Sequence, residues 1–84
     1  MRHAVALLYE DGQHAAPVVV SSGEGDLAER IERAARDYGV PVVHDAPLAA
    51  ALEGISVGDA IPEALYESVA AIFTELSLPA ERSR

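Results

Sequence analysis

Residues 4–20 read AVALLYEDGQHAAPVVV, in which two apolar runs flank a polar stretch. The first run, residues 4–9, is apolar throughout, and the second, residues 17–20, is rich in valine, whose branched side chain favours extended backbone. Gly12 and the acidic residues before it are typical of a turn. We therefore predict a β-hairpin of two mostly buried strands. Its connection is longer than a two-residue turn, so the register stays open.

A helix is predicted directly after the hairpin. Asp26, with Glu29 three residues later, fits a capping pattern, and Gly39 fits the glycine that commonly ends a helix. Between them, apolar residues recur at helical spacing and charged residues occupy the opposite side. The side chains predicted to face the core are those of Leu27, Ile31, Ala34, Ala35 and Tyr38.

The rest of the chain alternates short apolar runs with helical patterns. Residues 40–43 are interpreted as a strand, and a strand that follows a strand and a helix predicts a right-handed crossover with parallel pairing. A short helix starts near Pro47 and ends at Gly54, residues 55–57 form a brief extended segment, and Pro62 starts the last helix. The predicted buried stripe of that last helix is Leu65, Val69, Ile72, Phe73 and Leu76.

These elements predict an α/β fold. It has a small mixed β-sheet of about three to four strands flanked by about three helices, in the order β-β-α-β-α-(β)-α. A chain of 84 residues has room for one core. We expect a single domain over residues 1–78 and a frayed polar tail over residues 79–84, because Pro79 disfavours a continued helix.

The composition argues against several classes of partner. Six basic residues, all arginine, are outnumbered by 14 acidic ones, which leaves a formal net charge of -8. Such a charge repels nucleic acid and anionic lipid. No apolar run approaches the roughly 20 residues that cross a bilayer, and we expect no signal peptide, because residues 1–3 lead directly into a strand-like run. We expect a cytoplasmic domain with no nucleic acid partner and no membrane insertion.

The sequence offers little for metal or cofactor binding. It has no cysteine, and His3, His14 and His44 lie at none of the spacings of known metal motifs. His3 and His44 would be neighbours if their strands paired, which leaves a pH-responsive or adventitious metal contact open. We expect histidines at strand ends and in loops, and neither a metal nor a cofactor.

Two further patterns favour structural roles over binding roles. Gly23 and Gly25 precede a helix as in a phosphate loop, but Glu24 between them would repel an anion. Arg30, Arg33 and Arg36 lie at three-residue spacing on the predicted helix. Two of them, Arg33 and Arg36, follow Glu29 and Glu32 by four positions, which is typical of a solvated face. No serine, histidine and aspartate are predicted to converge, so we expect no enzyme.

Three stretches, taken in order, resemble the cytoplasmic domain of the FlhB/YscU family of type III secretion export-gate proteins. They are AVALLYE at 4–10, GVPVVHDAPLAAAL at 39–52 and VGDAIPEALYESVAAI at 57–72. Ala-Pro at 16–17 and Gly-x-Gly at 23–25 also fall at the family's offsets. The resemblance implies a role in flagellar or related protein export, with export-apparatus proteins and export substrates as partners.

The resemblance also implies a docking site. In the family, the Ala-Pro that opens the second strand and two positions of the last helix form an apolar patch implicated in docking export substrates. The matching positions here are Ala16, Pro17, Ala70 and Phe73. Simple packing of the second strand on the last helix is the alternative. The chain departs from the family where lysine is frequent, at Leu8, Val18 and Ser22.

Family members cleave themselves at an Asn-Pro-Thr-His motif just before the first strand of this domain. Here Met1 falls on the threonine position and Arg2 on the histidine, so we expect no self-cleavage. The chain is interpreted as a stand-alone counterpart of the post-cleavage fragment, and a trimmed piece would look the same. We expect a monomeric, non-enzymatic protein-binding module of export, with the oligomeric state left open. The alternative is a cytoplasmic adaptor or regulator with the same fold and no role in secretion.

Overall fold

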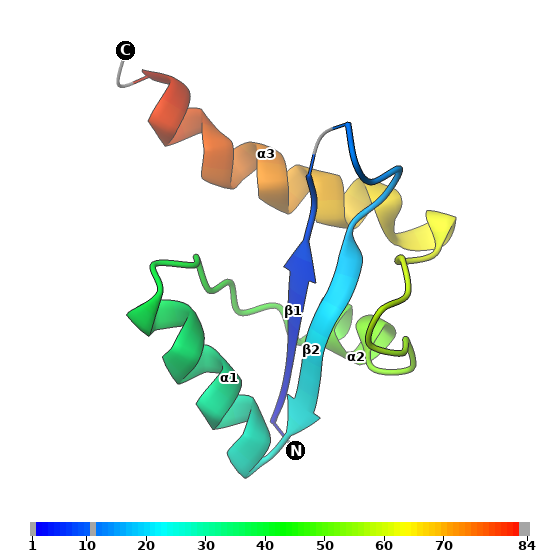
Figure 1. Ribbon diagram of the computed structural model, residues 1–84, viewed down its shortest axis with the longest axis vertical. Coiled ribbons are helices and arrows are strands. Elements are labelled where there is room, and N and C mark those ends of the chain that lie inside the picture. Colours follow the sequence, from blue (N-terminus) through cyan, green and yellow to red (C-terminus); the bar gives the residue numbers. More distant parts are fainter. Residues whose placement is uncertain (1, 11, 83–84) are drawn as a thin grey trace.

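The computed structural model of the protein describes residues 2–10 and 12–82. Strands β1 (His3–Leu8) and β2 (Val18–Glu24) pair antiparallel, which confirms the predicted hairpin (Figure 1). The register runs from His3 opposite Glu24 to Leu8 opposite Val18, with a β-bulge at the step between Ala6 and Leu7. At this step Val20 of β2 has no partner on β1, a feature that the sequence pattern left open.

Helix α1 (Asp26–Asp37) follows β2 and packs against both strands. Its N-terminal cap is Gly25, which has a φ of 59°, and no side chain caps the helix, so the predicted cap at Asp26 is wrong by one residue. The predicted end is confirmed, since Gly39 has a φ of 76° and the amide of Val40 donates to the carbonyl of Ala35 at 2.7 Å.

The buried face of α1 differs from the prediction. Ala28 and Glu32 are buried, whereas Leu27 is 46% exposed and Tyr38 is 85% exposed. The small side chain of Ala28 lets the helix approach the sheet closely, and Glu32 is covered by an arginine from the start of β1. The helix is therefore rotated relative to the stripe that its apolar residues predict.

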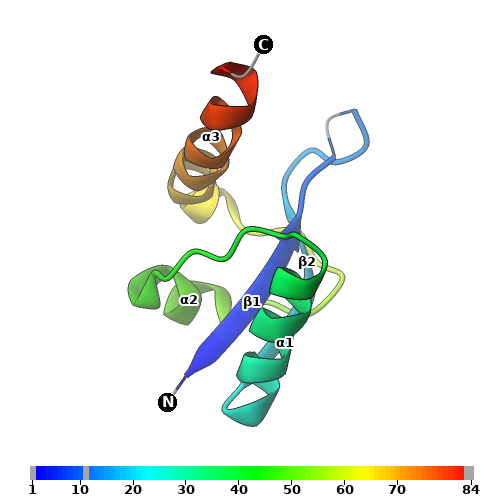
Figure 2. The ribbon, with the colours of Figure 1, turned by 90° about the vertical axis from the view of Figure 1, so that its left-hand side faces the viewer.

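The predicted strand over residues 40–43 does not form, so the parallel crossover was wrong. Residues 40–45 have no regular secondary structure, and within the described chain the sheet has two strands. Pro41 has no amide to donate, and the amide of Val40 is already bonded within the end of α1. The segment crosses β1 on its way to α2 (Ala46–Leu52) (Figure 2). Its side chains and those of β1 line a common cavity.

A later segment takes the place of the predicted extended residues 55–57. Ala60 forms an isolated antiparallel bridge with Val18, and the amide of Ile61 donates to the carbonyl of Pro17 at 3.0 Å. The amide of Val19 likewise donates to the carbonyl of Asp59 at 2.9 Å. The edge of β2 is therefore covered by residues 58–61, a few positions later than predicted.

The last helical region consists of a 3₁₀ turn η1 (Glu63–Leu65) and helix α3 (Tyr66–Arg82). Pro62 precedes the turn in an extended conformation, close to the predicted start. The backbone of α3 continues past Pro79, later than the sequence indicates. The frayed tail over residues 79–84 stays a prediction, and residues 83–84 lie outside those described. No helix in the described part of the chain is long and apolar enough to cross a bilayer.

The core lies where the hairpin, α2 and α3 meet. Its buried side chains are Ala16, Val19, Leu52, Ile61 and Val69. Leu65 and Phe73 of the predicted stripe pack against this cluster, but Leu76 is 38% exposed. Figure 1 shows why: the C-terminal half of α3 runs away from the hairpin.

Candidate functional site

The four residues implied by the family resemblance divide into buried and accessible ones. Ala16 is 5% exposed and belongs to the core cluster that contains Val69. Phe73 is half-buried against that cluster, Pro17 is half-buried, and Ala70 is exposed. Residues at the start of β2 and in the first turns of α3 therefore share the core cluster. Ala16 contributes packing, and the other three contribute surface.

Backbone hydrogen bonds fix the position of Pro17. Its carbonyl accepts the amide hydrogen of Ile61, and Val18 next to it bridges to Ala60. Proline has no amide hydrogen, so its position at the entry to β2 leaves no donor unpaired in the ladder. The ring of Pro17 therefore stands at a fixed point beside the segment that leads into α3.

An aromatic pair extends this surface to the end of β1. The rings of Tyr9 and Phe73 are 6.4 Å apart between centroids and are inclined by 39°, a geometry that favours aromatic contact. Tyr9 and Tyr66 are each 41% exposed. Tyr66 lies four residues before Ala70 and seven before Phe73, a spacing that puts all three on the same side of α3. We call Tyr9, Pro17, Tyr66, Ala70 and Phe73 the α3 patch.

Sequence reasoning did not assign Tyr9 or Tyr66 to the site. Tyr9 was interpreted only as the end of a strand, and its partner Phe73 lies far along the chain, beyond the reach of any local pattern. A tyrosine directly before an acidic turn is the signal that was available, because such a residue is exposed on one side. Both tyrosines offer an apolar ring with a polar tip, the combination that is enriched in protein interfaces.

A second apolar surface results from the rotation of α1. The exposed side chains of Leu27, Tyr38 and Val40 border a hollow of about 380 Å³ whose floor includes Ala6 of β1 and Ser21 of β2. We call this surface the α1 hollow. It was not predicted, because the sequence pattern assigned Leu27 and Tyr38 to the core.

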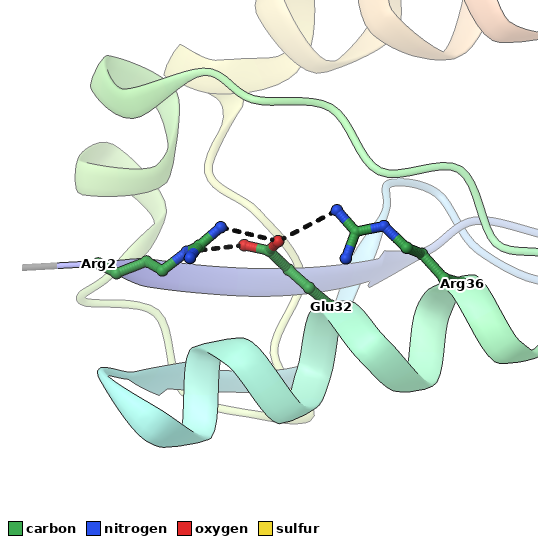
Figure 3. A network of polar contacts seen from close by, with 3 residues as sticks. All are labelled: Arg2, Glu32 and Arg36. Atoms are coloured by element: carbon green, nitrogen blue, oxygen red, sulfur yellow. Dashed lines mark hydrogen bonds and ion pairs between the residues drawn. The ribbon is translucent and has the colours of Figure 1, made fainter.

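One ion network fixes the start of β1 against α1 (Figure 3). Arg2 donates to both carboxylate oxygens of Glu32, from Nε at 3.2 Å and from Nη2 at 3.1 Å. Arg36 donates to Glu32 Oε1 at 3.4 Å, which confirms the predicted pair four residues apart. Local spacing had no means of detecting Arg2, since it lies thirty positions from Glu32.

The histidines occupy separate environments. His14 accepts the amide hydrogen of Glu10 at Nδ1, at 3.0 Å, inside the hairpin loop. His44 is exposed in the irregular segment, and no strand pairing joins that segment to β1 within the described residues. His3 instead lies beside Ser22 and Glu24 of β2.

Comparison with known sequences gives a consistent family. Residues 1–76 match the model of the FlhB HrpN YscU SpaS Family. Protein YlqH of Bacillus subtilis (strain 168) is 43% identical over 74 residues, which cover 88% of this chain and 80% of YlqH. The flagellar biosynthetic protein FlhB of Helicobacter pylori (strain ATCC 700392 / 26695) is 37% identical over 84 residues, which cover 98% of this chain and 23% of that protein.

Comparison with solved structures agrees with the sequence matches. The PscU C-terminal domain has a TM-score of 0.84 at 32% identity, covering 88% of this chain and 95% of that domain. The cytoplasmic domain of FlhB from Shewanella putrefaciens has a TM-score of 0.85 at 34% identity, covering 90% of this chain and 62% of that one. The chain spans less than a quarter of the FlhB proteins of Aquifex aeolicus (strain VF5) and Helicobacter pylori (strain ATCC 700392 / 26695). It belongs to the FlhB HrpN YscU SpaS family and has the fold of the C-terminal cytoplasmic domains of that family.

Proposed function

We propose that the protein is a non-enzymatic binding module of flagellar or related type III protein export, and that it docks export substrates or apparatus proteins through the α3 patch. The observation that carries the proposal is the pair of Tyr9 and Phe73, which places partly exposed aromatic rings where β1, β2 and α3 meet. The names of several relatives, flagellar biosynthetic protein FlhB, supply the process.

The chemistry of the α3 patch suits a protein partner. Aromatic side chains dominate the energetics of protein interfaces because they bury a large apolar area with few rotatable bonds. Ala70 between the two aromatic positions of α3 leaves a shallow point at which a partner side chain can approach the helix backbone. A partner with apolar side chains at its centre and basic residues at its rim would complement both this patch and the formal charge of -8.

We further propose that the domain acts in the cytoplasm, without nucleic acid, membrane insertion or a catalytic step. The cytoplasmic location rests on the Shewanella putrefaciens structure, which is described as a cytoplasmic domain. The sequence Asn-Pro-Thr-His, at which the family cleaves itself, does not occur in this chain. A docking module needs only a stable surface, and the core cluster behind Phe73 supplies the support for one.

A capture experiment in native cytoplasm tests the proposal. Wild-type protein, Phe73→Asp, Pro17→Asp and Tyr38→Asp are immobilised separately after circular dichroism confirms that each is folded. Tyr38→Asp is the matched control, because it places the same charge on an aromatic position of the α1 hollow. We expect wild type and Tyr38→Asp to retain flagellar or type III export proteins, and Phe73→Asp to retain at least about ten-fold less, the loss typical of an interface anchor.

Two outcomes would contradict the proposal. Loss of capture in Tyr38→Asp but not in Phe73→Asp would move the docking surface to the α1 hollow. Absence of export proteins from the wild-type sample would favour the second candidate, a cytoplasmic adaptor or regulator outside secretion. Leu8, Val18 and Ser22 are the observation in its favour, because none of the three carries the lysine frequent in the family. Leu8 is 43% exposed, whereas Val18 and Ser22 are half-buried.

A further inference from the structure

The side chain of His3 is buried with one ring nitrogen unpaired. It is 10% exposed, and its Nε2 lies 3.2 Å from the hydroxyl of Ser22. Nδ1 is shielded from solvent and makes no hydrogen bond to any described residue. Buried polar nitrogens are nearly always satisfied, so an orphaned one needs a partner that protein atoms do not provide.

The orphaned nitrogen faces negative charge. Oε2 of Glu24 lies 3.7 Å from Nδ1, too far for a hydrogen bond and close enough for a shared cation. When Nε2 donates its hydrogen to Ser22, Nδ1 presents a lone pair towards this carboxylate. A cation placed between these two groups would have an electron pair from each.

A third ligand comes from another element. Glu53, the residue that caps the C-terminal end of α2, brings a carboxylate oxygen to the same place. The ligand atoms of His3, Glu24 and Glu53 all lie within 4.8 Å of one another. Zinc ligands about 2 Å from the ion in tetrahedral geometry are roughly 3.3 Å apart. Both glutamates are exposed, so small rotations of their side chains can bring the ligand atoms from within 4.8 Å of one another to the separation that zinc requires.

We propose that His3, Glu24 and Glu53 bind a divalent transition metal ion such as Zn²⁺. One imidazole nitrogen with two carboxylates is a donor set that zinc and its neighbours in the first transition series accept. Ser22 serves as the outer partner that orients the ring, the role that a hydrogen-bond acceptor on the distal nitrogen plays in metal sites. Three protein ligands leave a fourth position for water.

An ion at this site would connect three separate elements of the fold. His3 starts β1, Glu24 ends β2 and Glu53 follows α2, so one ion would tie the open end of the hairpin to α2. An ion bound only to the folded state raises its stability by mass action, so binding is visible without knowledge of any partner.

Titration with Zn²⁺, followed by calorimetry and thermal unfolding, tests the site in metal-free protein. Co²⁺ absorption then reports the coordination. We expect one equivalent of Zn²⁺ to bind and to raise the melting temperature, and we expect His3→Gln and Glu53→Gln each to weaken binding by at least about ten-fold. Glu53 is exposed, so its variant keeps the fold even if His3→Gln does not.

His14→Gln and His44→Gln are the controls. His44 borders the same cavity as His3, and His14 lies in the hairpin loop, so unchanged binding in both variants separates the site from general attraction of cations to an acidic protein. Undiminished binding in both His3→Gln and Glu53→Gln overturns the proposal. So does wild-type protein that binds no Zn²⁺.

Discussion

Arg2 and Glu32 form a two-pronged ion pair that joins the first residue before β1 to the middle of α1, with N–O distances of 3.2 and 3.1 Å. The side chain of Glu32 is 11% exposed and that of Arg2 is 49% exposed. The carboxylate would otherwise be a nearly buried charge against the sheet. Its position therefore depends on a residue outside the helix that carries it.

Removal of Arg2 should destabilise the fold more than removal of Glu32. In Arg2→Met the carboxylate stays buried with only Arg36 beside it, and we expect a loss of about 1 to 2 kcal/mol, less than for a fully buried pair because Arg2 is half exposed. Glu32→Met removes the buried charge itself and should cost less. Urea unfolding of both variants checks the order, and a neutral Arg2→Met would show that water solvates Glu32 adequately.

Truncation of Val69 should cost more than truncation of Leu76. Val69 is 2% exposed in the core cluster, whereas Leu76 is 38% exposed on the part of α3 that leaves the hairpin. We expect Val69→Ala to lower the free energy of unfolding by about 2 kcal/mol, and Leu76→Ala by well under half of that. Equal losses in denaturant titrations would mean that α3 packs along its whole length.

Gly25 should resist replacement more than Gly54. Gly25 has a φ of 59°, which costs other residues about 1 to 2 kcal/mol, although nothing lies within 4 Å of an added Cβ. Gly54 has equally open surroundings without a positive φ, so Gly54→Ala is the matched control and should be neutral or slightly stabilising. Thermal melts of the two variants separate backbone strain from crowding. Similar melting temperatures would show that the turn before α1 relaxes.

Tyr9 should contribute to docking through Phe73. If the α3 patch binds a partner, Tyr9→Ala should weaken that binding by about ten-fold or more, as for an aromatic interface anchor. The double variant with Phe73→Ala should then lose less than the sum of the two single losses, because the rings are in contact. Binding of a purified export protein to all four forms completes this cycle. Strict additivity would place the two rings in separate contacts.

Local signals in the sequence were sufficient for the hairpin and for the approximate positions of the helices. Two apolar runs on either side of a polar turn predicted the hairpin, and Gly39 predicted the end of α1. Asp45 caps α2 by accepting the amide hydrogen of Leu48 at 3.1 Å, a contact within one helical turn. The resemblance of three ordered stretches led to the family that the comparisons show. The cap of α2 and the end of α1 each depend on residues a few positions apart.

Tertiary structure alone decided how those elements meet. The bulge in the hairpin, the rotation of α1 onto Ala28 and Glu32, and the loss of the strand at 40–43 depend on packing between distant segments. The same holds for Tyr9 beside Phe73 and for His3 between two carboxylates. Local pattern reports which residues prefer burial or a given backbone conformation. It does not show which segments lie close to one another in space, and the proposed sites of this protein are formed by residues from different segments.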